Sequence, residues 1–168
     1  HCPSSNLKLA SGFAPVVAML EQDVNVGLGT DGAASNNRLD MFQEMRTGAL
    51  LAKAVAGRAE AFPAAKALSA ATLAGARALG LENSVGSLLP GKSADLCAVY
   101  LEGPGQMPCY DPVSHLVYAC GRENVTHVWV EGALLVQDGA LVRSKEYDLD
   151  RRVRLWQNKL ALENRGLS

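Results

Sequence analysis

Residues 24–37 read VNVGLGTDGAASNN, a short apolar run followed by a glycine-rich polar loop. The run Val24–Leu28 predicts a buried strand, because four to eight apolar residues bounded by turn signals are typical of one. A helical pattern precedes it at residues 15–20, and another follows from about Leu39. The order helix, strand, loop, helix is half of a repeating α/β pattern.

The loop contains Gly27, Gly29 and Gly32 in the spacing of a dinucleotide fingerprint. Three features argue against that interpretation. The carboxylate of Asp31 would face the pyrophosphate, the next helix starts about six residues too late, and no acidic residue follows about 20 positions on. An Asp at the carboxyl end of a strand can instead bind a divalent metal or move a proton. The alternative from spacing alone is that Asp31 and Ser35 cap a turn and the next helix.

Two further helices are expected in the first half of the chain. Asn36 or Asn37 is predicted to cap the helix that begins near Leu39. Its buried face is predicted from helical spacing at Leu39, Phe42, Met45, Ala49 and Ala52. Pro63 starts an alanine-rich helix that Gly80 ends. Glu44, on the first of these helices, is expected to pair with Arg46 or a neighbour.

The second half of the chain has a different residue pattern, rich in strand and turn signals. Strands are predicted at Leu96–Leu101, Val125–Val130 and Ala133–Val136, the last two joined by a turn at Glu131 and Gly132. Residues 103–112 are predicted to form a loop or linker. A polar helix at Leu149–Leu160 follows.

Composition limits the classes of function. The chain has 168 residues, 16 Lys and Arg against 17 Asp and Glu, and a net charge of −1. That balance argues against nucleic-acid binding, and no apolar run is long enough to span a membrane. Four scattered cysteines form no zinc or disulfide pattern, which favours a reduced, cytoplasmic protein. Because the chain starts at His1 with interior-like sequence, we expect it to be part of something longer.

Three blocks of sequence resemble the carboxyl-terminal part of amidohydrolase-superfamily, metal-dependent deaminases. They are HCPSSNLKLASGFAPV (1–16), VNVGLGTDGAASNNRLDMFQEMRTGALL (24–51) and ATLAGARALGLENSVGSLLPGKSADLCAVYL (71–101). The most similar branch is that of 5-methylthioadenosine/S-adenosylhomocysteine deaminases, which are related to triazine hydrolases. The resemblance continues through VWVEGALLVQDG (128–139).

The resemblance implies an α/β fold, namely the carboxyl-terminal portion of a metal-dependent hydrolase (β/α)8 barrel plus part of a small β-sandwich. Residues 1–82 would hold the last two βα units, 83–145 the β-rich part, and 146–168 a terminal helix and tail. A complete barrel needs about 250 residues. The amino-terminal half of the barrel is therefore an implied partner.

The resemblance also implies site residues and one divalent metal, zinc, with iron as the alternative. Asp31 matches the family's metal-binding and proton-transferring Asp. Gly32, Ser35 and Asn36 would line the substrate mouth, and His1, near the pocket, would either bond the following loop or face substrate. The family's metal-binding histidines have no counterpart here, and His115 and His127 are expected to be structural.

The implied activity of the parent protein is deamination of a small-molecule nucleoside, methylthioadenosine or S-adenosylhomocysteine. Hydroxide formed at the metal would attack the purine ring and release ammonia. The isolated chain is predicted to be inactive, and its unpaired barrel edge to favour homo-oligomers. The alternatives are a guanine deaminase, a triazine chlorohydrolase, or a non-catalytic split-gene half or remnant that acts as an assembly partner.

Overall fold

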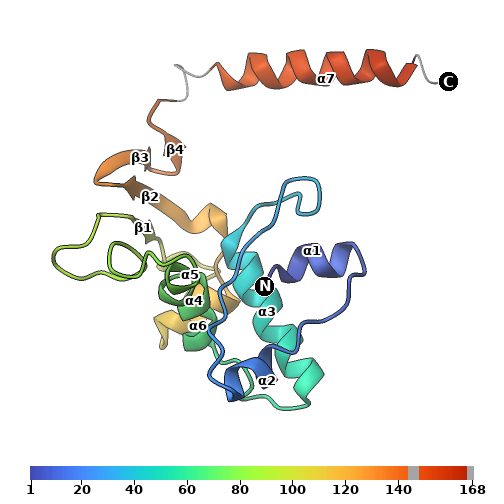
Figure 1. Cartoon of the computed structure of the whole chain (residues 1–168). Coiled ribbons are helices and arrows are strands. Elements are labelled where there is room, and N and C mark those ends of the chain that lie inside the picture. Colours follow the sequence, from blue (N-terminus) through green and yellow to red (C-terminus); the bar gives the residue numbers. More distant parts are fainter. Residues whose placement is uncertain (144–147, 166–168) are drawn as a thin grey trace.

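The computed structural model describes residues 1–143 and 148–165. Helices dominate the first part of the chain and a small sheet follows (Figure 1). In chain order the elements are α1 (Pro3–Lys8), α2 (Val16–Glu21), α3 (Met41–Ala56), α4 (Ala64–Ala71), α5 (Leu73–Ala78), β1 (Leu96–Val99), α6 (Pro112–Tyr118), a 3₁₀ turn (Arg122–Asn124), β2 (Val125–Val130), β3 (Ala133–Gln137), β4 (Ala140–Leu141) and α7 (Leu149–Arg165).

Helix α3 is the centre of the helical part, and α1, α2, α4 and α6 all contact it. Its predicted inner face is confirmed at Met45, Ala49 and Ala52, which are buried in the apolar core. The helix starts later than predicted, because Asp40 and not an asparagine caps it. The Asp40 carboxylate accepts hydrogen bonds from the backbone N–H groups of residues 42 and 43. Leu39 therefore lies outside the helix with its side chain half exposed.

The predicted strand at Val24–Leu28 is not formed as a regular strand. Its segment is extended, and Val26 is buried against the core as expected. A strand is defined by ladder bonds to neighbours, and here the ladder is short. Among the described residues, only His1 exchanges backbone bonds with this segment on one side, while the Leu28 N–H donates to the Ala70 carbonyl.

The single helix predicted from Pro63 to Gly80 is two helices, α4 and α5. The break falls at Thr72, whose φ of −128° and ψ of −99° are not helical. Two contacts accompany the break: the Thr72 hydroxyl donates to the Leu68 carbonyl, and the Ala70 carbonyl accepts from Leu28. The first contact is local, and the second is long-range because Leu28 belongs to the extended segment 24–28.

The sheet is antiparallel throughout, in the order β1-β2-β3-β4. The predicted turn between β2 and β3 is confirmed, since Glu131 and Gly132 both have the positive φ that tight hairpins require. The first strand is shorter than predicted and ends at Val99. Helix α7 is longer than predicted and projects away from the other elements (Figure 1).

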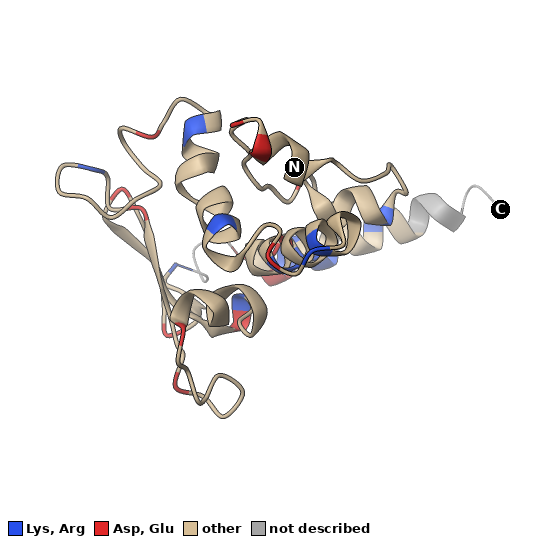
Figure 2. Cartoon of the chain, turned by 90° about the horizontal axis from the view of Figure 1, so that it is seen from below, with Lys and Arg blue, Asp and Glu red and all other residues tan. Residues whose placement is uncertain are grey.

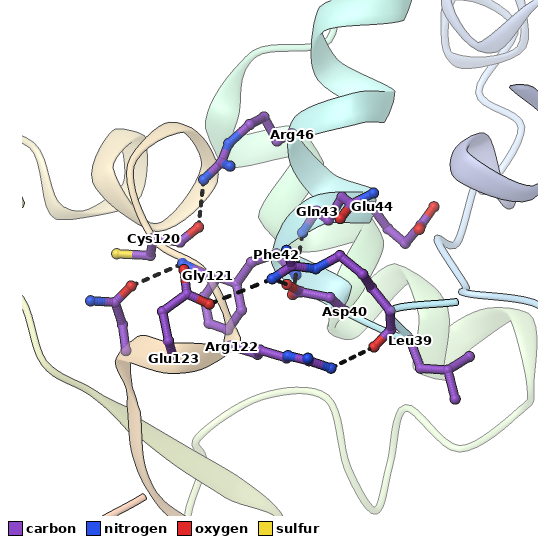
Figure 3. Close-up of polar contacts among 12 residues, drawn as sticks. Leu39, Asp40, Phe42, Gln43, Glu44, Arg46, Cys120, Gly121, Arg122 and Glu123 are labelled. Atoms are coloured by element: carbon purple, nitrogen blue, oxygen red, sulfur yellow. Dashed lines mark hydrogen bonds and ion pairs between the residues drawn. The ribbon is translucent and has the colours of Figure 1, made fainter. Parts of the chain in front are cut away.

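Helix α6 lies within the part predicted to be β-rich, where no helix was expected. Asp111 caps it through a bond from the Val113 N–H, and Pro112 suits its first turn. It packs against α3 and α4, so residues 83–145 contribute to the helical body. Arg46 of α3 stabilises the packing of α6 against α3. Its guanidinium donates hydrogen bonds to the carbonyls of Val117 (3.3 Å) and Cys120 (2.5 Å; Figure 3). The division at residues 82 and 145 remains a prediction.

Charged residues are interspersed over the helices and loops (Figure 2). Near the start of α3, the guanidinium of Arg38 forms ion pairs with the carboxylates of Asp40 (nitrogen to oxygen 3.3 Å) and Glu123 (3.6 Å). The Arg122 guanidinium donates a hydrogen bond to the Arg38 carbonyl. This cluster ties the loop before α3 to the turn before β2. Within the described part of the chain, no helix is both long enough and apolar enough to cross a bilayer.

Candidate metal and substrate site

The site is built where the extended segment 24–28 ends. The His1 backbone nitrogen donates to the Gly27 carbonyl (2.8 Å), and the Gly29 N–H donates to the His1 carbonyl (3.0 Å). His1 thus bonds through its backbone to the residues on either side of Leu28. This is the hydrogen-bond pattern of two parallel strands. Leu28 and His1 therefore lie side by side. The chain continues from Leu28 into the glycine-rich loop and from His1 into α1. Asp31 follows Leu28 by three residues.

The carboxylate of Asp31 is fixed by three donors. Its Oδ2 atom accepts from the hydroxyls of Ser5 (2.7 Å) and Ser35 (2.8 Å), and its Oδ1 atom accepts from the Gly32 N–H (2.7 Å). The residue itself has a φ of +60°, in the left-handed region that Asp tolerates better than most residues. Backbone and side chain are thus both held in one orientation.

These hydrogen bonds also set the charge of the group. The Ser5 hydroxyl, then the Ser35 hydroxyl and the Gly32 N–H, lower the pKa of Asp31 below its ordinary value. Each donor stabilises the ionised form more than the protonated form. The carboxylate stays exposed and ionised, which is the state in which it can bind a cation.

The residues predicted to line the substrate mouth divide into two kinds. Gly32 is exposed, and a Cβ atom placed on it would meet no atom within 4 Å. The Ser35 hydroxyl contacts Asp31 directly. Asn36, in contrast, is only 3% exposed: its side-chain amide donates to Glu44 of α3, and its Oδ1 atom accepts from the Leu39 N–H.

His1, the remaining residue predicted to contact substrate, lies beside Leu28. It lines an apolar cavity of about 1250 Å³ together with Cys2, residues 24–29, α5 and β1. Its Nδ1 atom is buried and has no hydrogen-bond partner among the described residues. Asp31, Gly32 and Ser35 are not among the residues that line this cavity, whereas Gly29, two residues before Asp31, is.

Glu44 is a buried member of the site region that sequence reasoning misplaced. It does not pair with Arg46, and Figure 3 shows the two side chains on opposite sides of α3. Its carboxyl group is fully buried and accepts from the Asn36 side-chain amide (2.6 Å) and from the Ser4 N–H (3.0 Å). A signal was present in the sequence, because Glu44 shares its helical stripe with Gly48 and Ala52, which are buried.

The other two histidines lie on other elements. His115 is on α6, with its Nδ1 atom 3.1 Å from the Asp111 carbonyl. His127 is on β2 and stacks on Trp129 at a centroid distance of 5.5 Å. Neither contacts the residues that hold Asp31.

Comparison with known proteins identifies the family. A model of the Amidohydrolase family matches residues 1–135, most of the chain. The chain belongs to the amidohydrolase family. It is 48% identical over 160 residues to a 5-methylthioadenosine/S-adenosylhomocysteine deaminase from Teredinibacter turnerae, covering 95% of this chain and 36% of that protein. It thus spans about a third of the length of such relatives.

Solved amidohydrolase structures confirm the expected α/β fold class. An adenosine deaminase from Xanthomonas campestris with bound zinc superposes with a TM-score of 0.92 at 48% identity, over 96% of this chain and 37% of that one. An atrazine chlorohydrolase from Arthrobacter aurescens complexed with zinc superposes with a TM-score of 0.80 at 29% identity, over 96% and 35%. The predicted likeness to both the deaminase and the triazine branches is confirmed.

The donor set at Asp31 fits one position in an amidohydrolase metal site. A carboxylate oxygen is an accepted zinc ligand, and hydrogen bonds that orient a ligand carboxylate are typical around bound metals. The described residues contain no group of three or more His, Cys, Asp and Glu side chains able to hold a metal together. Among the described residues, Asp31 thus presents a single carboxylate of a type that zinc accepts.

Proposed function

We propose that the full-length protein containing this chain is a metal-dependent deaminase of adenosine-type nucleosides, such as methylthioadenosine or S-adenosylhomocysteine. The observation that carries the proposal is the Asp31 carboxylate, exposed, ionised and oriented by three donors where the extended segment ends. Identity of 48% to a deaminase of this name over 95% of the chain supports the substrate class.

Asp31 is proposed as both metal ligand and proton carrier. Zinc is the metal we favour, with iron as the alternative, and when bound it would supply a nucleophile from water at neutral pH. The Asp31 carboxylate would take the proton of the attacking water and hold it for the leaving amino group. The hydroxyls of Ser5 and Ser35 keep that carboxylate aligned during the transfer.

Substrate contact is proposed for Gly32, Ser35 and His1. The open space at Gly32 would let a ligand approach the backbone closely. The Nδ1 atom of His1 has no hydrogen-bond partner among the described residues, so it could bond to a substrate. Asn36 would act indirectly, by fixing the loop that carries Ser35.

The remaining metal ligands are proposed to come from the amino-terminal part of the full-length protein. Catalytic zinc normally takes three protein ligands or more, so Asp31 alone would not retain it. The isolated chain is therefore expected to be inactive. Homo-oligomer formation and a cytoplasmic location stay predictions.

The test is release of ammonia by the zinc-loaded full-length protein, with the isolated 168-residue chain as control. We expect ammonia from methylthioadenosine or S-adenosylhomocysteine with the full-length protein and none above blank with the isolated chain. No ammonia from either nucleoside with the full-length protein would contradict the proposal.

A second candidate reaction is hydrolytic dechlorination of a triazine, favoured by the superposition on the atrazine chlorohydrolase. Chloride release from atrazine without ammonia release from the nucleosides would select it. Ammonia release from guanine alone would select a guanine deaminase. A full-length product that binds no metal and turns over none of these compounds would favour a non-catalytic assembly role.

A further inference from the structure

Glu44 joins two segments that are far apart in the sequence. Its Oε1 atom accepts from the Asn36 side-chain amide, in the loop that follows Asp31, and its Oε2 atom accepts from the Ser4 N–H, in the first turn of α1. Neither donor is a cation. The carboxyl group is 0% exposed, and losing a partner to such a buried group is costly.

Each partner of Glu44 is next in sequence to a residue that holds Asp31. Ser4 precedes Ser5, and Asn36 follows Ser35, and both serine hydroxyls donate to the same Oδ2 atom of Asp31. One buried carboxyl group therefore bonds to the backbone of the residue next to one of these serines and to the side chain of the residue next to the other.

The polarity of this link is fixed. The Oδ1 atom of Asn36 accepts from the backbone N–H groups of Arg38 and Leu39, both at 3.2 Å. The Nδ2 atom must then point to Glu44, and Glu44 must accept on both of its oxygens. An amide side chain at position 44 would have an NH₂ group in place of one carboxylate oxygen. That NH₂ group would face the Ser4 N–H or the Asn36 amide, and two donors cannot bond to each other.

We propose that Glu44 is a positioning residue for Asp31, acting through Ser4–Ser5 and Ser35–Asn36 to aim the Asp31 carboxylate at the metal. The inference rests on the proposed function of Asp31. It assigns to a buried side chain of α3 the control of a ligand that it does not touch.

The test compares four forms of the full-length protein: wild type, Glu44→Gln, the reciprocal double variant Asn36→Asp with Glu44→Gln, and Met45→Ala. The first variant breaks the polarity of the link. The double variant restores it. The carboxylate introduced at position 36 would accept from the amide introduced at position 44, whose carbonyl oxygen would still accept from the Ser4 N–H. Met45→Ala is the control, because Met45 is also buried but belongs to the apolar core.

Two quantities are measured: zinc affinity by chelator competition, and hydrogen–deuterium exchange of residues 32–38 in the metal-free protein. Loss of a group that hydrogen-bonds a metal ligand directly typically weakens metal binding about 10- to 100-fold. Glu44 lies one contact further out, so we expect a loss of zinc affinity no larger than this, with faster exchange at residues 32–38, for Glu44→Gln. We expect substantial recovery of both in the double variant and wild-type zinc affinity for Met45→Ala.

Wild-type zinc affinity and loop exchange in Glu44→Gln would overturn the inference, as would equal zinc loss in Met45→Ala or no recovery in the double variant. Failure of the proposed function looks different. If the wild type itself binds no zinc, the metal proposal is wrong, while the exchange comparison on metal-free protein still decides whether Glu44 positions the loop.

Discussion

The hydroxyl of Ser5 lies 2.7 Å from the Oδ2 atom of Asp31, across 26 residues of sequence. This contact joins the first turns of α1 to the loop that ends the extended segment 24–28. Ser5 follows His1 by four residues and Asp31 follows Leu28 by three, and the backbone of His1 is itself hydrogen-bonded to the residues on either side of Leu28. The candidate ligand is thus held by the same arrangement that aligns the two backbones.

Replacing Ser5 with Ala should raise the pKa of Asp31 toward its ordinary value, since the Ser5 hydrogen bond is the largest cause of the lowering. Protons compete with metal for a carboxylate, so a higher pKa lets them compete at higher pH. The acid limb of zinc binding by the full-length protein should move to higher pH. Titration of zinc affinity against pH measures the shift.

Ser35→Ala is the companion variant and should shift the same limb in the same direction. Thr30→Ala is a matched control, because the Thr30 hydroxyl donates to the Asp31 backbone carbonyl and not to the carboxylate. An unchanged pH dependence in both serine variants would contradict the role given to these hydroxyls.

Arg46→Ala should destabilise the protein without acting on the polar site. It removes two hydrogen bonds to carbonyls of Val117 and Cys120, residues that are themselves fully buried. Leaving a buried acceptor unsatisfied costs about 1–3 kcal/mol. Denaturant unfolding measures the loss, with exposed Arg77→Ala as the control. Equal stability of the two variants would show that the two hydrogen bonds of Arg46 do not stabilise the protein.

Gly27→Ala should also be destabilising, for a steric reason. A Cβ atom on Gly27 would lie 3.0 Å from the Cα atom of Gly75, where backbone meets backbone. Overpacking of this kind costs about 1–3 kcal/mol. Gly105→Ala is the control, since a Cβ atom there meets nothing within 4 Å. Thermal unfolding of both variants compares them, and a Gly27→Ala protein as stable as its control would contradict the close approach.

Local sequence signals predicted the parts of this fold that local interactions determine. The hairpin at Glu131 and Gly132 and the buried stripe of α3 follow from turn chemistry and helical spacing. The break at Thr72 was missed because it accompanies a distant contact, the bond from Leu28 to Ala70. Helix α6 has a local start signal in Asp111 and Pro112, but it is only 7 residues long.

The candidate site was predicted unevenly for the same reason. Asp31 stands out because a carboxylate in a glycine-rich loop after an apolar run is a local pattern. The donors that orient it, and the buried link through Glu44, depend on how α1, the loop and α3 meet. Asn36, which the resemblance places at the substrate mouth, is buried and donates its side-chain amide to Glu44.

The most direct test of the central claim is the zinc content of the full-length protein and of its Asp31→Asn variant, measured by mass spectrometry of the metal after dialysis. Asparagine keeps the size of the side chain but not the charge that a ligand carboxylate supplies. We predict one tightly held zinc ion per chain in the wild type and its loss in Asp31→Asn. Equal zinc in both proteins would contradict the assignment of Asp31 as a metal ligand.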